Sequence, residues 1–132
     1  MAVRSGARKA WVDRMSDVLN PVEVEQEIRA LSNRITQGVR VVSQKHEEHL
    51  RAERLYDQAF ARAYMAAAGP AHERKYAAEL ATMHERELKD AAEVVFRYSD
   101  RQARALENEL RAWQSIGASV RAMYGTQQGV GR

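Results

Sequence analysis

The chain has 132 residues, of which 30% are charged and none is cysteine, so it fits a single domain and most multi-domain enzymes are excluded. The lack of cysteine also excludes a disulfide framework, a thiolate zinc site and a thiol nucleophile. The net charge is only +3, and 22 of the hydrophobic residues are alanine, which buries little apolar surface. This composition predicts long amphipathic helices with a thin core. No apolar run approaches the length of a membrane span, and no secretory signal is apparent, so we expect a soluble cytoplasmic protein without membrane contacts.

Residues 1–19 are expected to form a short, basic, amphipathic arm. The apolar residues that recur there at helical spacing are Val3, Ala7, Trp11, Met15 and Val18 or Leu19. The basic residues between them are Arg4, Arg8, Lys9 and Arg14. Two roles fit this pattern: packing on the rest of the chain or on a neighbouring subunit, or binding nucleic acid through Arg8 and Lys9.

The following segment, residues 20–124, is predicted to be helical with one turn. Asn20 is a good N-cap, Pro21 suits the first helical position, and Glu23 completes a capping-box pattern. The next break is Gly69-Pro70, where glycine can take the left-handed conformation and proline can open a helix. The second helix is expected to run from about Pro70 to Tyr124, and residues 125–132 to form a flexible, glycine-rich tail.

Both helices carry apolar residues with a period close to seven, as in coiled coils. The seam residues are Ile28, Ile35, Val42, His49 and Tyr56 in the first helix and Leu106, Leu110, Trp113 and Val120 in the second. Helices of about 70–80 Å need a partner along their length. We therefore predict an all-α, antiparallel, coiled-coil-like hairpin, in which residue i lies roughly beside residue 139 − i. Ile116 and Met123 widen the stripe of the second helix, which predicts a homo-oligomer of at least two chains.

The basic residues are unevenly distributed. Residues 29–45 contain four basic residues and no acidic one, and residues 97–124 contain five basic and three acidic residues. The hairpin would bring these stretches to one level, which predicts a surface that binds polyanions. Its basic residues would be Arg29, Arg34, Arg40, Lys45, Arg97, Arg101 and Arg104. Phe96 and Tyr98 could stack on bases, although core packing suits at least one of them better, and either basic stretch alone could be a solvated helix face.

Residues that carry catalytic or metal chemistry are scarce. The only histidine pair close in sequence is His46 and His49, whose spacing differs from that of the H-E-x-x-H zinc motif. A polar residue such as His49 in a seam more often selects register or partner. The chain also lacks a nucleophile elbow and a phosphate-binding loop. We expect no enzymatic activity, no metal site and no cofactor.

Two segments carry a family resemblance. The run Leu50-Arg51-Ala52-Glu53, followed by Ala59-Phe60-Ala61-Arg62-Ala63-Tyr64 and Gly69, resembles a stretch of the phage recombination mediator family (UvsY-like). Residues 105–123 are similar to helical segments of small proteins from prophage recombination regions. The resemblance implies a ring-like homo-oligomer in the host cytoplasm. It would bind single-stranded DNA and help to load a recombinase onto strands covered by single-stranded-DNA-binding protein.

The resemblance also assigns a role to one residue. A basic residue beside the tip contacts DNA in that family, and the matching position here is Arg62. The family's tip is richer in lysine and glycine, however, whereas this chain has the run Ala66-Ala67-Ala68. The charge distribution instead favours DNA contact in the middle of the hairpin.

The sequence leaves two main hypotheses for function. The first is a phage-type recombination or replication accessory protein that binds single-stranded DNA without sequence preference. The alternative is a helical protein-interaction module, such as an adaptor, an inhibitor or a virion scaffold, without a role in nucleic-acid binding.

Overall fold

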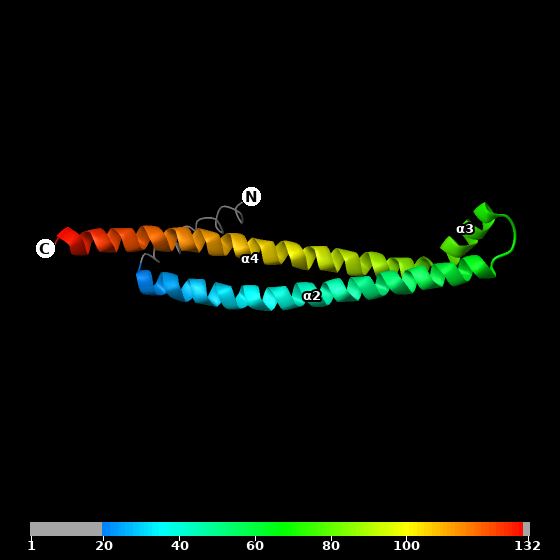
Figure 1. The fold of residues 1–132 in the computed structure, drawn as a ribbon, viewed down its shortest axis with the longest axis horizontal. Helices are drawn as coiled ribbons and strands as arrows, with labels where there is room; N and C mark the ends of the chain where they lie inside the picture. Colours follow the sequence, from blue (N-terminus) through cyan, green and yellow to red (C-terminus); the bar gives the residue numbers. More distant parts are fainter. Residues whose placement is uncertain (1–19, 131–132) are drawn as a thin grey trace, which may run out of the picture. The chain divides into compact units, whose positions relative to one another are not determined.

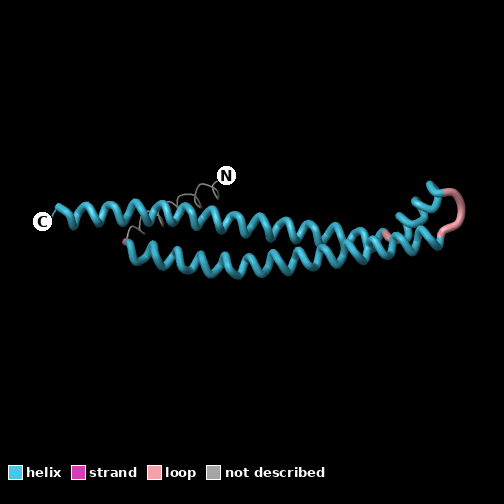
Figure 2. The backbone as a smooth tube through the Cα atoms, viewed as in Figure 1, coloured by secondary structure: helices cyan, strands magenta, loops and turns pink. Residues whose placement is uncertain are grey.

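The protein is all-helical in the computed structural model, which describes the backbone of residues 20–130 and the side chains of residues 20–125. Its helices are α2 (Pro21–Ala66), α3 (Ala71–Ala81) and α4 (Met83–Val130), and no strand occurs within the described range (Figures 1 and 2). The all-α prediction is therefore confirmed. The basic arm predicted for residues 1–19, with Arg8 and Lys9, lies outside the described residues.

α2 begins at the predicted cap. The Asn20 side chain accepts a hydrogen bond from the backbone N–H of Val22 at 2.9 Å. This bond satisfies one of the amide groups that a helix leaves without a partner in its first turn. The Asn20 carbonyl accepts from the N–H of Val24 at 3.1 Å. The helix then continues through Gly38 to Ala66 without interruption.

The chain turns at the predicted glycine. α2 ends at Ala66, and Gly69 has a φ angle of 104°, which side-chain-bearing residues rarely adopt. Pro70 follows as the N-cap of α3, with φ −69° and ψ 162°. Glycine and proline thus share the turn in the way that the sequence indicates.

Thr82 interrupts the second helical stretch, which the sequence predicts to be continuous. Its φ of −116° and ψ of 19° lie outside the helical region, and its hydroxyl donates to the Ala78 carbonyl at 2.7 Å. The Thr82 backbone N–H is shared between the carbonyls of Ala78 and Glu79. Threonine side chains compete in this way with regular helical bonds. α3 leaves the line of α4 here (Figure 1), so the expectation of one helix from Pro70 is wrong.

The predicted end of the second helix also differs from the structure. α4 continues through Gly125 to Val130, six residues beyond the expected end at Tyr124. A glycine within a helix costs about 1 kcal/mol relative to alanine, which weakens a helix without ending it. The residues assigned to the tail, 125–132, are therefore helical as far as residue 130.

The chain divides into two compact units, which are described separately below. Unit 1 comprises residues up to Thr36 together with those from Ala105 onward. In unit 1 the first turns of α2 pack against α4 near Gly117. Its buried hydrophobic side chains are Val24, Leu31 and Val120, with 2%, 4% and 3% of their surface exposed. A Cβ placed on the buried Gly117 would lie 3.2 Å from Val24 Cγ1, so this glycine permits close contact between the two helices.

Unit 2 comprises residues 37–104 and contains the turn, α3 and the remaining parts of α2 and α4. The His46 ring stacks on Phe96 with 4.7 Å between the centroids, and Lys89 Nζ lies 4.9 Å from the centre of the Tyr56 ring. The two helices therefore run antiparallel within this unit. The expected register places His46 beside residue 93, whereas its partner, Phe96, lies three residues further along the chain. The expected register assumes a two-residue turn, whereas the connection takes four residues and α3 diverges from α4.

Candidate nucleic-acid interface

The candidate interface surrounds the aromatic part of the unit 2 seam. Phe96 lies against two histidines of α2, with centroid distances of 4.7 Å to His46 and 6.2 Å to His49. Phe96 is half-buried, so it packs between the helices. This contact fixes which side of α4 faces α2, and hence where the neighbouring charged residues project.

Three arginines follow Phe96 on one flank of α4. Their spacing of i, i+4 and i+7 places Arg97, Arg101 and Arg104 on the same face of a helix with 3.6 residues per turn. We call these three residues the arginine stripe. They surround a surface hollow of about 410 Å³, which Asp100 also lines. All three arginines are exposed.

Two members of the stripe are partly neutralised by carboxylates on the same helix. Arg97 pairs with Glu93 at 2.9 Å, and Arg104 pairs with Asp100 at 3.1 Å. Arg101 has no carboxylate partner among the described side chains, and its Nε instead donates to the Arg97 carbonyl at 3.5 Å. The exposed ion pairs are weak and easily exchanged for a phosphate. Arg101 is thus the central cation of the stripe.

The basic residues of α2 do not lie on the same face as the stripe. Lys45 occupies a seam position, is half-buried, and pairs with Glu48 at 3.3 Å. Arg40 precedes the seam residue Val42 by two positions, which places it near the outer face of α2. The two basic stretches therefore reach a similar level in unit 2, but they project in different directions.

The other predicted nucleic-acid contacts are separate from the stripe. Arg62 is exposed on α2, four residues before the helix ends at Ala66. Arg29 and Arg34 are exposed on α2 in unit 1. The structure thus brings together three of the eight predicted basic residues that it describes.

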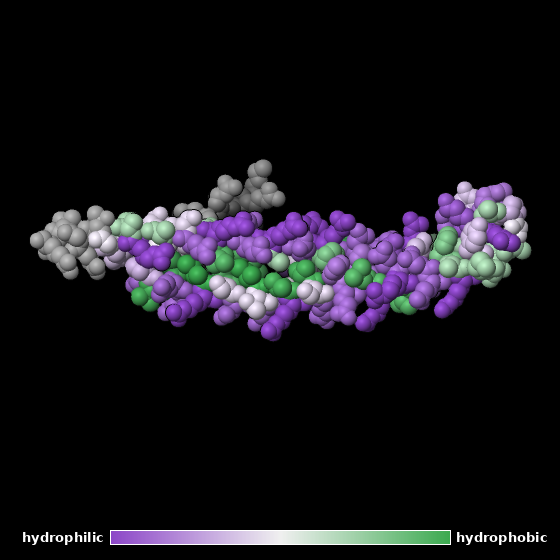
Figure 3. Space-filling view, viewed as in Figure 1, coloured by the Kyte–Doolittle hydropathy of each residue, from purple (hydrophilic) through white to green (hydrophobic). Residues whose placement is uncertain are grey.

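The predicted seam residues lie on the covered side of their helices. Val120 is buried, and the other eight are half-buried: Ile28, Ile35, Val42, His49, Tyr56, Leu106, Leu110 and Trp113. Hydrophobic residues form a band between hydrophilic ones on the face shown in Figure 3. The sequence pattern missed Val24 and Gly38, which precede Ile28 and Val42 by four positions and so belong to the companion series of the heptad in α2.

Tyr98 is available for contact with a ligand. Its side chain is 59% exposed, and its hydroxyl accepts a hydrogen bond from Gln102 Nε2 at 2.7 Å. It lies next to Arg97 in the chain, on the part of α4 that faces away from the seam. Of the two aromatic residues considered for stacking on bases, Phe96 therefore packs in the seam and Tyr98 is exposed.

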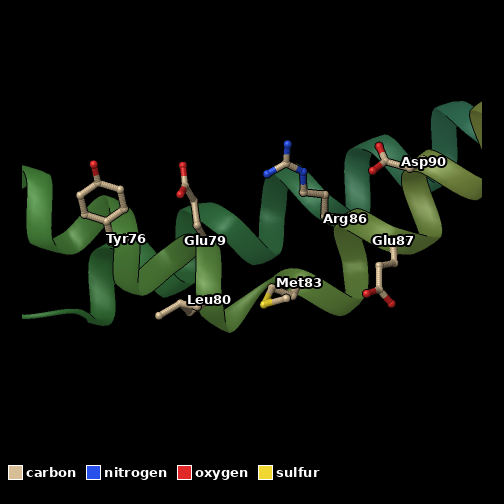
Figure 4. A pocket seen from close by; sticks show the side chains of 7 residues that line it. All are labelled: Tyr76, Glu79, Leu80, Met83, Arg86, Glu87 and Asp90. Carbon is tan, nitrogen blue, oxygen red and sulfur yellow. The ribbon is translucent and has the colours of Figure 1, made fainter.

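A second hollow lies at the bend between α3 and α4, and sequence reasoning missed it. It has a volume of about 420 Å³ and is lined by Tyr76, Glu79, Leu80, Met83, Arg86, Glu87 and Asp90 (Figure 4). We call it the elbow hollow. The only sequence signal for it is Thr82, a residue that is common in unbroken helices, so the bend has no clear signature.

The histidines that lie close together in the sequence are engaged in ring contacts. Among the described side chains, no group of three or more histidine, aspartate or glutamate residues is arranged to hold a metal ion. His46 and His49, the pair considered for a metal, stack on Phe96. None of the described helices has the length and apolarity to cross a membrane.

Comparisons with known proteins add no assignment. No protein-family model matches the chain, and no curated protein or solved structure is significantly similar to it. The surfaces described above are therefore the basis for the functional proposal.

Proposed function

We propose that the chain is a phage-type recombination or replication accessory protein that binds single-stranded DNA without sequence preference. The observation that carries the proposal is the arginine stripe, a row of three exposed arginines around a hollow with the exposed Tyr98 nearby. Cations that track the phosphate backbone, together with an aromatic platform for bases, are typical of proteins that bind single strands. The resemblance to recombination mediators adds the role of loading a recombinase.

The proposed form is a homo-oligomer of antiparallel helical hairpins. Support comes from an apolar flank, formed in unit 2 by Leu55, Leu88 and Val95. Leu55 and Leu88 each directly precede a member of the Tyr56–Lys89 contact, so they project to the same side of the antiparallel pair. Arg97 directly follows Phe96 and projects to the opposite side. A second copy on the apolar flank would therefore leave the arginine stripe free for DNA.

Fluorescence anisotropy of labelled oligo-dT, measured at several salt concentrations, tests the proposal. The triple variant Arg97→Gln, Arg101→Gln, Arg104→Gln should bind more weakly. The slope of log K against log salt concentration should become less steep by about 2, because each phosphate contact on a single strand contributes about 0.7 to that slope. The control variant Arg51→Gln, Arg54→Gln, Arg111→Gln removes the same charge elsewhere and should retain most of the binding.

Three results would contradict the proposal. Wild-type protein that fails to bind at low salt would exclude a DNA-binding role. Salt-independent binding would exclude a backbone mode. Equal losses in the two triple variants would mean that overall charge, and not the stripe, attracts the DNA.

A second function, that of a helical protein-interaction module, is favoured by the apolar flank itself. Leu55 and Leu88 are 56% and 52% exposed, and such clustered apolar surface often marks a protein interface. Light scattering on the purified chain separates the two functions. An oligomer at micromolar concentration would assign the flank to other copies of the chain, whereas a monomer that captures a protein from nuclease-treated lysate would favour the module.

A further inference from the structure

The elbow hollow combines exposed apolar side chains with an acidic rim. Tyr76, Leu80 and Met83 are 63%, 72% and 55% exposed, although large apolar residues are normally covered. Leu80 and Met83 project at the bend between α3 and α4 (Figure 4). The two side chains flank the break at Thr82 and form one apolar patch in the hollow.

The rim of the elbow hollow carries a net negative charge. Three carboxylates, those of Glu79, Glu87 and Asp90, and one guanidinium, that of Arg86, line it. Among the described side chains, none of these four groups takes part in an ion pair. The carboxylates therefore remain available to cations, and the hollow suits an occupant with apolar residues on one face and basic residues beside them.

We propose that the elbow hollow is the docking site for residues 1–19 of a second copy of the chain. This segment carries apolar residues at helical spacing, including Trp11 and Met15, and four basic residues against two acidic ones. Trp11 would fill the apolar floor, since tryptophan is enriched among the residues that contribute most binding energy in protein interfaces. The basic residues would meet Glu79, Glu87 and Asp90. The inference concerns self-assembly and is independent of DNA binding.

The occupant is assigned to a second copy because of the length of α2. The 46 residues of this helix lie between residues 1–19 and the turn that leads to α3. A helix of that length measures about 69 Å, whereas 19 helical residues measure about 28 Å. A segment that docks as a helix, as the spacing of its apolar residues favours, is therefore too short to run back along α2 to the turn of its own chain.

A contact of this kind joins two different surfaces and is therefore heterologous. The second copy would present its own elbow hollow to the arm of a third, and the assembly would close into a ring or extend as a filament. The proposal thus specifies how copies of the chain are joined, beyond the general expectation of a homo-oligomer.

Site-directed crosslinking tests the proposal, because the chain contains no cysteine and each introduced thiol is unique. Full-length Leu80→Cys chains are mixed with full-length Ala7→Cys chains of different mass and treated with a short bismaleimide in the absence of DNA. The expected result is a crosslinked product that contains one chain of each kind. The control pairs Ala7→Cys with Met123→Cys, an exposed position in unit 1, and should give little product.

Charge neutralisation tests the role of the rim. Adding Glu79→Gln, Glu87→Gln and Asp90→Asn to the Leu80→Cys chain should abolish most of the product, while circular dichroism shows unchanged helicity. The proposal is overturned by an absent product, by equal product with the Met123→Cys control, or by a yield that neutralisation leaves unchanged. It is also overturned if a double variant, Ala7→Cys with Leu80→Cys, crosslinks within one chain regardless of dilution. DNA binding can succeed or fail independently of each result.

Discussion

Unit 1 and unit 2 use the same pair of helices in different ways. In unit 1 the seam is apolar and tightly packed, with Val24, Leu31 and Val120 buried and Gly117 allowing close approach. In unit 2 the seam contains His46, His49, Lys45 and Tyr56, none of which is fully buried. The apolar flank, the elbow hollow and the arginine stripe all lie in unit 2.

This difference assigns most of the folding stability to unit 1 and most of the binding surface to unit 2. Burial of aliphatic side chains is the main source of folding free energy, so the seam of unit 1 should hold the helices together. Unit 2 buries less and presents more functional surface. Substitutions should therefore affect stability most in unit 1 and binding most in unit 2.

The largest expected effect on stability comes from Leu31→Ala in unit 1. It should lower the free energy of unfolding by about 2 kcal/mol or more, because it leaves a cavity in a buried seam. Leu55→Ala in unit 2, where the side chain is 56% exposed, should change it by less than about 0.5 kcal/mol in the monomeric chain. Urea unfolding at two protein concentrations measures both. Equal losses of unfolding free energy in the two variants at the lower protein concentration would show that the units do not differ in this way.

A smaller loss is expected from Gly117→Leu, by about 1–3 kcal/mol, since the new side chain would overlap Val24 in the closely packed seam. Gly125→Leu is the matched control, because a Cβ at that position meets nothing within 4 Å. Thermal unfolding followed by circular dichroism compares the two variants. A stable Gly117→Leu protein would show that close approach of the helices contributes nothing to unit 1.

The smallest of the three effects is expected for Gly69→Ala in unit 2. Alanine at a φ of 104° should cost about 1–2 kcal/mol of local backbone strain. Because the turn is exposed, we expect faster amide exchange in α3 and little change in unit 1. Hydrogen exchange monitored by mass spectrometry tests this, and increased exchange in unit 1 of similar size would show that the units do not respond separately.

Much of the fold could be predicted because strong local signals coincide. Asn20, Gly69 and Pro70 act through their own backbone and side-chain chemistry, and the heptad pattern reports which residues face the partner helix. Thr82 could not be predicted as a break, since threonine also occurs within regular helices and its hydroxyl bond to Ala78 depends on the local geometry. That break and the four-residue connection also shift the register from the expected pairing.

The candidate site was harder to predict than the fold. Counting charges along the chain groups Lys45 with Arg97 and Arg101, but it ignores the 100° rotation between successive helical residues. Only the stacking of Phe96 on His46 shows which flank of α4 carries the arginines. The elbow hollow depends on the bend at Thr82 and therefore has no linear pattern to reveal it.

The polar residues in the seam of unit 2 have one further consequence, which concerns alignment. A seam of identical aliphatic residues could slide by one heptad, about 10.5 Å, and still bury the same surface. The contacts of His46 and His49 with Phe96, and of Lys89 with Tyr56, exist in only one alignment. Unit 2 therefore buries less apolar surface than an all-aliphatic seam would, but its two helices pack in a single register. Every group on its surface consequently keeps a fixed position.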